Sequence, residues 1–237
     1  MAGPLVVITG ASSGIGLALA RAFAKDGNAL LLIARHMKMP EGLPAGRTMC
    51  AEADVADYTA LEKAIRGAEA TFGETACLIN SAGLADAREF RAVEPAAYAH
   101  EIDVNPKGVL NGTKAVLGDM SAHGAGTIVN ISSVSDRKTS PVAVTYTTTK
   151  YGVRAFSESV RETEGKNGVR VINIAPGYVR TNIHAGMGIS FEEYKRILGN
   201  PDFLSAEELA DIVLYCWKLP AHICVRDIVV TPTRTTF

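Results

Sequence analysis

Short runs of consecutive apolar residues alternate along this chain with longer stretches in which apolar residues recur every three or four positions. A short unbroken apolar run is typical of a strand buried on both faces of a parallel sheet, and the longer period is typical of an amphipathic helix. The runs therefore predict strands, which we expect at residues 5–8, 29–33, 48–53, 77–79, 126–131, 169–174 and 227–230.

The stretches between these runs predict helices. They are expected at residues 17–26 and 60–72, in a segment that ends at 98–102, from 103 to 121, in a segment that contains Tyr146 and Lys150 and ends near 163, and at 191–198. A last helix should open at Ser205, which forms a capping-box pattern with Glu208. Two prolines make residues 37–46 mostly loop.

Alternating strands and helices predict an α/β fold, in which a Rossmann-like, doubly wound parallel sheet of about seven strands carries helices on both faces. No Pro/Ser-rich linker or internal repeat divides the sequence, so we expect one domain over residues 1–237. The irregular, glycine-containing stretch 178–204 is expected to form a lid over a substrate. Ligands bind such sheets at the carboxyl ends of the strands, which is where the polar motifs described below fall.

The composition argues against several classes of function. A formal net charge of -1 gives no overall field that would attract nucleic acid or a membrane surface. No apolar run approaches the roughly 18 residues that span a bilayer, and too few residues precede the first strand for a signal peptide. The four cysteines show no metal-ligand spacing. We therefore expect a cytoplasmic protein without a metal site, a nucleic-acid partner or a membrane partner.

A glycine-rich turn, T-G-A-S-S-G-I-G at residues 9–16, follows the first strand and opens the first helix. Strand, turn and helix in this order are typical of a pyrophosphate site, because the helix N-terminus offers free N–H groups and a partial positive charge. Gly10 would permit the tight turn, Gly14 the close approach of a pyrophosphate, and Gly16 close packing of the helix.

The end of the second strand indicates which dinucleotide would bind. An acidic residue about 20 positions after the glycine turn would bind the ribose hydroxyls of NAD, whereas a cation suits the 2′-phosphate of NADP. Here the strand ends in Ala34, Arg35 and His36, and no carboxylate occurs before Glu41. We therefore expect NADP, bound with the help of Arg35, in preference to NAD.

Tyr146 and Lys150 are four residues apart in a predicted helix, so their side chains share one face. A nearby ammonium group stabilises a phenolate and is expected to lower the pKa of Tyr146 from ~10 toward neutrality. A hydroxyl with such a pKa can serve as a general acid or base. Alone this spacing is weak evidence, because both residue types are common on helix surfaces.

The order and spacing of seven short motifs resemble those of the short-chain dehydrogenase/reductase family over essentially the whole chain. The motifs are T-G-A-S-S-G-I-G (9–16), D-V (54–55), N-S-A-G (80–83), V-N-P-K-G (104–108), I-V-N-I-S-S (128–133), Y-T-T-T-K (146–150) and P-G-Y-V-R-T (176–181). The resemblance implies an oxidoreductase that transfers a hydride between NADP(H) and a carbonyl or secondary alcohol of a small to medium-sized substrate. It also implies a homodimer or homotetramer assembled through the helices near 107–121 and 146–163.

The resemblance further implies roles for individual residues. Tyr146 would be the general acid or base, and Lys150 would lower its pKa and hold the nicotinamide ribose. Ser133 would hydrogen-bond the substrate oxygen, with Ser132 as its nearest rival, and Asn105 would complete a proton relay. The residues expected to bind the cofactor are Gly10, Ser12, Ser13, Gly14, Ile15, Gly16, Arg35, Asp54, Val55, Asn80, Ala82, Gly83, Tyr146, Lys150, Pro176, Gly177, Val179 and Thr181.

Three positions depart from the usual pattern of that family. Ser81 stands where a second Asn is commoner, and three consecutive threonines after Tyr146 weaken helix propensity. Pro106 disfavours helical geometry at Asn105, which either sharpens a bend that exposes the Asn105 carbonyl or disturbs the relay.

The sequence leaves the substrate and one alternative function open. Arg180 or His184 could receive a carboxylate, sulfonate or phosphate, so a small anionic hydroxy acid or aldehyde is one hypothesis and a neutral ketone or alcohol is the other. A cofactor-binding regulatory or scaffold protein is the alternative function, although the Ser–Tyr–Lys set that it would have lost is complete here. The residues expected to shape specificity are Val134, Ser135, Arg137, Val142, Thr145, Tyr178, Arg180, His184 and Met187.

Overall fold

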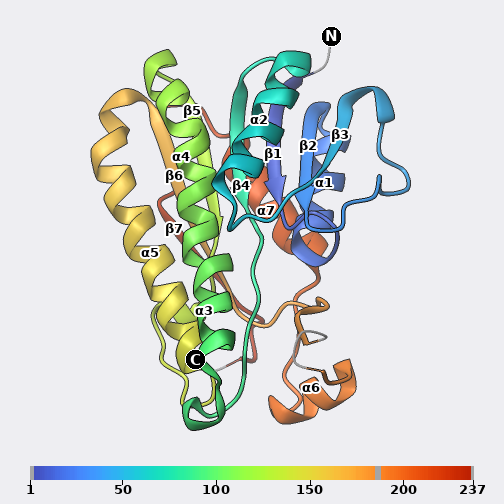
Figure 1. The fold of residues 1–237 in the computed structure, drawn as a ribbon, viewed down its shortest axis with the longest axis vertical. Coiled ribbons are helices and arrows are strands. Elements are labelled where there is room, and N and C mark those ends of the chain that lie inside the picture. The colour runs from blue at the N-terminus through green and yellow to red at the C-terminus, as the bar shows by residue number, and fades with distance from the viewer. Residues whose placement is uncertain (1–2, 185–187, 236–237) are drawn as a thin grey trace.

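The computed structural model describes residues 3–184 and 188–235, and a seven-stranded sheet forms its centre (Figure 1). The strands lie in the order β3-β2-β1-β4-β5-β6-β7, and every neighbouring pair is parallel. The predicted α/β fold class is confirmed. The strands are β1 Gly3–Thr9, β2 Asn28–Ala34, β3 Thr48–Glu52, β4 Thr75–Asn80, β5 Gly126–Ile131, β6 Val169–Pro176 and β7 Asp227–Val230.

Helices cover both faces of this sheet. α1 (Gly14–Lys25) and α7 (Ala206–Lys218) pack together on one face, and α2 (Tyr58–Phe72), α4 (Pro106–His123) and α5 (Val144–Glu164) cover the other (Figure 1). The shorter helices α3 (Pro95–Val104) and α6 (Phe191–Ile197) lie beyond the carboxyl ends of the strands. The predicted capping box opens α7, because the Ser205 and Glu208 side chains bond each other's backbone N–H groups.

Strand β1 shows why its sequence is apolar at every position. Val6 and Ile8 belong to the core cluster beneath α1 and α7, whereas Leu5 and Val7 belong to the cluster beneath α2 and α4. Successive side chains of a strand point to opposite faces, so a strand covered on both faces has no polar side. All four side chains are completely buried.

The strand order reverses between β1 and β4, which makes their carboxyl ends the topological switch point of the sheet. Thr9, the last residue of β1, connects the end of β1 to the loop after β4 through hydrogen bonds. Its Oγ1 accepts hydrogen bonds from the backbone N–H groups of Ser81 and Ala82, at 3.1 and 3.2 Å. Loops from distant parts of the sequence therefore meet at one edge of the sheet.

Asn105 marks a break between two helices. α3 ends at Val104 and α4 begins at Pro106, with Asn105 (φ -71°, ψ -73°) as the shared cap. Proline is tolerated at the first position of a helix because its missing N–H would have no intrahelical acceptor there. Pro106 thus starts α4, and Asn105 keeps a right-handed helical conformation, contrary to the expectation that the proline disfavours helical geometry there.

The three threonines after Tyr146 are all helical within α5. Thr148 Oγ1 donates to the Val144 carbonyl at 2.9 Å, and Thr149 Oγ1 donates to the Tyr146 carbonyl at 2.7 Å. Thr147 and Thr149 are buried against the rest of the protein. Tertiary packing therefore overrides the weak helix propensity of this segment.

Candidate functional site

A cavity of about 780 Å³ opens at the carboxyl ends of the strands. It brings together residues that are more than 160 positions apart in the sequence, from Gly10 to Thr181. Of the residues predicted to bind the cofactor or to act in catalysis, the lining includes Gly10, Ser12, Ser13, Gly14, Ile15, Gly16, Arg35, Asp54, Val55, Ala82, Gly83, Ser133, Tyr146, Lys150, Pro176, Gly177, Val179 and Thr181. Two predicted residues, Asn80 and Asn105, lie behind this lining.

The glycine turn packs tightly against its own backbone and against the loop after β4 at the start of α1. A Cβ on Gly16 would lie 2.3 Å from the Gly10 carbonyl oxygen, and a Cβ on Gly10 (φ +68°) would lie 2.7 Å from the Ala82 backbone. No side chain fits at either position. Ser13 caps α1 without a side-chain hydrogen bond, so the first N–H groups of the helix have no side-chain acceptor. This cradle fits the pyrophosphate of a dinucleotide.

Arg35 lies in the same cavity, immediately after β2. Its side chain is exposed, and its neighbours in the lining include His36 and Asp54. The Asp54 carboxylate accepts a hydrogen bond from the Ala56 N–H at 2.9 Å. A cation at this strand end could pair with a phosphate on the adenosine ribose.

Tyr146, Lys150 and Ser133 meet at the opposite end of the cavity. Lys150 is 5% exposed, donates from Nζ to the Ile131 carbonyl at 3.0 Å, and lies 5.6 Å from the centre of the Tyr146 ring. Ser133 caps a short 3-10 turn, where its Oγ accepts from the Ser135 N–H at 3.1 Å, and its hydroxyl acts to lower the pKa of the neighbouring Tyr146. Among the two candidate serines, the contact with Tyr146 favours Ser133 over Ser132.

The expected low pKa of Tyr146 is wrong. Burial raises the pKa of Tyr146 to about 12, and the Ser133 hydroxyl offsets only part of this effect. Burial also lowers the pKa of Lys150 to about 8, although the negative charges of Asp136 and Glu101 oppose the change. The spacing of Tyr146 and Lys150 could not reveal this, because the cost of desolvating a charge depends on the surrounding fold.

Asn105 contacts the site through a buried hydrogen-bond cluster. Its Oδ1 accepts from the Leu84 N–H at 3.0 Å, and its Nδ2 donates to the Leu84 carbonyl at 2.9 Å and to Thr149 Oγ1 at 3.0 Å. A Cβ on Gly83 would lie 3.4 Å from Asn105 Oδ1 and 3.7 Å from Lys150 Nζ. Asn105 therefore joins the loop after β4 to the helix that carries Tyr146 and Lys150.

Asn80 is placed below the cavity, contrary to the expectation that it contacts the cofactor. Its Nδ2 donates to Asn130 Oδ1 at 2.9 Å, and Asn130 donates to Ser157 Oγ at 2.8 Å. Asn80 is the last residue of β4, and its side chain points toward Gly112 of α4. This chain of buried amides links β4 and β5 to α5, so its contribution is to position the Tyr146 helix.

The described residues of the predicted lid, 178–184 and 188–204, pair with each other at the two ends of the segment and pack through aromatic side chains. Val179 and Leu204 form a parallel bridge, with hydrogen bonds of 2.8 and 2.9 Å on either side of it. Phe203 contacts the rings of Tyr178, Phe191 and Tyr194. The side of the segment that lines the cavity consists of Tyr178, Val179, Thr181, Asn182, Ile183, Tyr194 and Leu198.

Several residues expected to shape specificity are engaged elsewhere. The Arg180 guanidinium lies 5.1 Å above the Phe191 ring, and His184 stacks on Tyr194. Neither belongs to the cavity lining in the part of the chain that the structure describes. Thr145 is likewise buried away from that lining, and Met187 falls outside the described residues.

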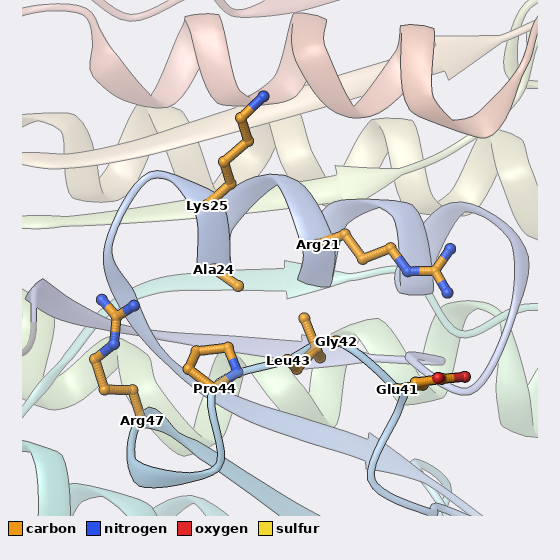
Figure 2. Close-up of a pocket in the computed structure, with 8 residues that line it drawn as sticks. All are labelled: Arg21, Ala24, Lys25, Glu41, Gly42, Leu43, Pro44 and Arg47. Atoms are coloured by element: carbon orange, nitrogen blue, oxygen red, sulfur yellow. The ribbon is translucent and has the colours of Figure 1, made fainter.

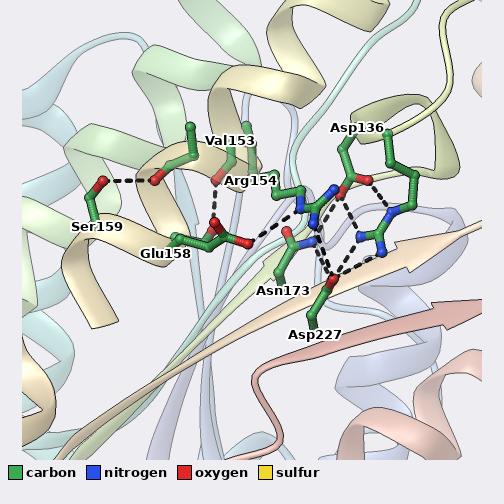
Figure 3. Close-up of polar contacts among 10 residues, drawn as sticks. Asp136, Val153, Arg154, Glu158, Ser159, Asn173 and Asp227 are labelled. Carbon is green, nitrogen blue, oxygen red and sulfur yellow. Dashed lines mark hydrogen bonds and ion pairs between the residues drawn. The ribbon is translucent and has the colours of Figure 1, made fainter. Parts of the chain in front are cut away.

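Arg137 belongs to a polar network whose members Asp136, Asn173 and Asp227 are labelled in Figure 3. It pairs with Asp136, which is completely buried, and with Asp227 of β7. Asn173 of β6 donates to both carboxylates at 2.9 Å. The network anchors the turn after Ser133 to the two strands at this edge of the sheet, so Arg137 supports the site without lining it.

Known proteins were compared with this chain. The family model for short-chain dehydrogenases matches residues 4–188. The chain belongs to the short-chain dehydrogenase family. Sulfoacetaldehyde reductase 2 of Chromohalobacter salexigens is 35% identical over 97% of this chain and 94% of that protein. Glycine betaine reductase of Emericella nidulans is 30% identical over 98% of this chain, which spans 19% of that longer protein.

Among solved structures, the closed form of a serine dehydrogenase in complex with NADP+ matches this short-chain dehydrogenase with a TM-score of 0.92. It is 26% identical, and the match covers 98% of this chain and 96% of the other. That structure is therefore similar over the sheet, both helical layers and the segment beyond the strand ends.

A second groove of about 630 Å³ lies on the outside of α1, away from the strand ends (Figure 2). Arg21 extends toward Glu41 across it, while Lys25 points away. Both Arg21 and Glu41 are exposed. None of the motifs of this short-chain dehydrogenase contributes a residue to it.

Two other kinds of feature, a metal site and a membrane-spanning helix, are not found in the described residues. Within residues 3–184 and 188–235, no group of three or more His, Cys, Asp or Glu side chains is arranged to hold a metal ion. In the same residues, no helix combines the length and the apolar character that crossing a membrane requires.

Sequence reasoning missed several residues of this short-chain dehydrogenase. Tyr194 and Leu198 line the cavity from α6, and no motif marked them in the irregular segment. Glu101 is completely buried in α3 beside the site, although glutamate is usually exposed. The burial of Glu101 could have been predicted from helical spacing, because positions 101 and 105 lie on the same helix face as the apolar residue Val104.

Proposed function

We propose that this short-chain dehydrogenase is an NADP(H)-dependent oxidoreductase that interconverts a carbonyl and a secondary or primary alcohol. The observation that carries this proposal is the meeting of Ser133, Tyr146 and Lys150 in one cavity with the glycine turn before α1. Bound NADPH would supply the hydride for carbonyl reduction. The residues proposed to hold it are those of the lining named above, with Gly14 at the pyrophosphate and Lys150 at the nicotinamide ribose.

Tyr146 is proposed to donate the proton that completes carbonyl reduction. Hydride addition leaves negative charge on the substrate oxygen, and Ser133 stabilises this charge by donating a hydrogen bond. The phenol then passes its proton to that oxygen. A pKa raised to about 12 keeps Tyr146 protonated at physiological pH, which suits the acid required for reduction. In the oxidation direction Tyr146 acts as the base.

Lys150 and Asn105 are proposed to support the reprotonation of Tyr146, with the proton supplied by solvent water. The Lys150 ammonium stabilises the phenolate that proton donation leaves behind. Asn105 joins the chain of buried contacts from Leu84 to Thr149 and so fixes the position of α5 relative to the loop after β4. Because Pro106 begins α4 without disturbing these bonds, the relay proposed for Asn105 is retained.

We propose a small or medium-sized neutral carbonyl compound as the substrate class. The cavity near Tyr146 is lined by Val134, Val142 and Ile183, together with the Tyr178 and Tyr194 rings of the lid. Hydroxyl groups of Ser135 and Ser140 supply polar contacts without charge. The two cations first considered for an anionic substrate, Arg180 and His184, pack against aromatic rings instead.

A small anionic aldehyde is the second candidate, and two observations favour it. One relative at 35% identity is named as a sulfoacetaldehyde reductase. Lys138 lines the cavity and could meet a sulfonate or carboxylate. NADPH oxidation measured with matched anionic and neutral aldehydes, in the wild type, Lys138→Gln and Arg180→Ala, decides between the two. If the protein reduces an anionic aldehyde, and the KM for that aldehyde rises in Lys138→Gln but not in Arg180→Ala, the substrate class is anionic and not neutral.

Tyr146→Phe tests the proposed function. The substitution removes only the hydroxyl, so we expect kcat for carbonyl reduction to fall by about 10²–10⁴-fold while NADPH affinity changes little. Tyr215→Phe is the matched control, because Tyr215 is 66% exposed on α7 and does not line the cavity. Steady-state kinetics and NADPH fluorescence titration provide the two measurements. Turnover retained in Tyr146→Phe would support the scaffold alternative or a different acid.

We further propose that residues 1–237 act as one catalytic domain with 178–204 as its lid, and that the protein is a homodimer or homotetramer. Leu110 of α4 and Tyr151 of α5 are exposed large side chains on adjacent helices. Such side chains are suited to a contact between copies. Light scattering of the purified protein measures the oligomeric state.

A further inference from the structure

Glu101 is a buried carboxyl group for which the proposed mechanism has no role. Its side chain is 0% exposed. Oε1 accepts a hydrogen bond from the Asp86 N–H at 3.2 Å, whereas Oε2 has no hydrogen-bond partner among the described residues. A buried polar atom without a partner destabilises the folded state, and an aliphatic side chain here would avoid that cost. The burial of Glu101 despite this cost indicates that its carboxyl group contributes to function.

The position of Glu101 connects it to the site. It precedes Asn105 by one helical turn, so both side chains lie on the same face of α3. Asn105 bonds Leu84 and Thr149, and Gly83 lies between the Asn105 amide and the Lys150 ammonium. The carboxyl group thus lies in the protein interior, where its charge acts on both Lys150 and Tyr146.

The charged groups that act on Glu101 come from two elements. Asp86, in the loop before α3, repels it and is itself paired with Arg88. Lys150 of α5 attracts it. Burial raises the pKa of Glu101 to about 7 and lowers that of Lys150 to about 8, so each group changes charge near neutral pH. Asp136 acts on Lys150 from the turn after β5.

We propose that Glu101 is a positioning residue whose buried carboxylate keeps Lys150 cationic and Tyr146 protonated. A negative charge stabilises the ammonium and opposes formation of the phenolate, so it raises the pKa of both groups. Both effects favour the form of the pair that donates a proton to a reduced carbonyl. The inference rests on the catalytic roles proposed for Tyr146 and Lys150.

Glu101→Gln tests this role because it keeps the shape and the acceptor for the Asp86 N–H but removes the charge. Without that charge the pKa of both Lys150 and Tyr146 falls. We therefore expect the basic limb of kcat/KM for carbonyl reduction to move to lower pH by about 0.5 unit or more. Asp103→Asn is the control, since that carboxylate on the same helix pairs with Lys107 at the surface. A basic limb that is unchanged in Glu101→Gln overturns the proposal.

A second measurement does not depend on turnover. Difference infrared spectroscopy can follow protonation of the Glu101 carboxyl, identified as the band lost in Glu101→Gln. Lys150→Met removes the attracting cation, so we expect the midpoint of this titration to move to higher pH. If the protein reduces no carbonyl, the proposed function is contradicted. The infrared midpoint of the Glu101 carboxyl then tests the coupling of Glu101 to Lys150 by itself. A midpoint unchanged by Lys150→Met overturns the coupling of Glu101 to Lys150.

Discussion

The same substitution should have opposite effects at two glycines of α4. A Cβ on Gly112 would lie 2.4 Å from Asn80 Oδ1, whereas nothing lies within 4 Å of a Cβ on Gly118. Gly112→Ala should displace Asn80 from its bond with Asn130 and destabilise the protein by roughly 1–3 kcal/mol. Gly118→Ala should stabilise it by about 0.5–1 kcal/mol, because alanine is the better helix former.

Urea denaturation of both variants and the wild type checks this pair. Since the two substitutions share a helix and a side-chain change, helix propensity cancels between them. Equal free energies of unfolding would contradict the role of Asn80 beneath the site.

Single residues also show the limit of the sequence. The need for glycine at positions 10 and 16 was predictable, because a turn after a buried strand dictates it. The raised pKa of Tyr146 and the burial of Glu101 were not, because both depend on how much solvent the folded protein removes. The sequence motif predicted that Asn80 contacts the cofactor, whereas in the structure its side chain points into the core.

Among the elements, the segment 178–204 combines little regular structure with defined packing. Phe203 contacts three rings, and aromatic pairs contribute about 0.5–1.5 kcal/mol each. Phe203→Ala should therefore loosen α6, which supplies Tyr194 and Leu198 to the cavity. We expect the KM for the carbonyl substrate to rise several-fold, with little change in NADPH affinity.

Ile197→Ala is the control for Phe203→Ala, since Ile197 is 63% exposed on the same short helix. Steady-state kinetics with both substrates varied separates the two affinities. A rise in the NADPH dissociation constant as large as the rise in KM would show that the segment supports the cofactor and not the substrate.

Helix and strand boundaries were largely predictable where caps set them. The expected 191–198 piece and the last helix begin after serine caps, whereas α4 begins at Pro106 and not at the expected residue 103. The aromatic contacts within 178–204 were not predictable, because they join residues up to 25 positions apart through irregular backbone. Hydrophobic periodicity predicts helices and strands, and an irregular segment has no such periodicity.

At the scale of the whole molecule, sequence reasoning anticipated seven strands but not their order. The pairing of β1 with β4 rather than with β3 joins segments about 70 residues apart. That pairing creates the switch point at which the glycine turn meets Ala82. The alternation of strands and helices predicted a doubly wound sheet, but hydrophobic periodicity could not specify this order.

The completed sheet also places Arg35 where it can select the cofactor. A charge-assisted hydrogen bond contributes about 1.5–3 kcal/mol, so NADPH should bind about 10–100-fold more tightly than NADH. Arg35→Ala should remove most of this difference by weakening NADPH alone. Arg21→Ala is the matched control, because Arg21 is exposed on α1 outside the cavity.

Thermal unfolding with each cofactor reports this preference for the intact molecule. A ligand that binds only the folded state stabilises it by about 2.7 kcal/mol at 100 times its dissociation constant. At equal concentrations, NADPH should therefore raise the Tm of the wild type more than NADH does, and Arg35→Ala should bring the two increases together. Equal increases in the wild type would contradict the assignment of Arg35 to a 2′-phosphate. Because hydride transfer chemistry is shared by the two cofactors, such a result would leave the roles proposed for Ser133, Tyr146 and Lys150 intact.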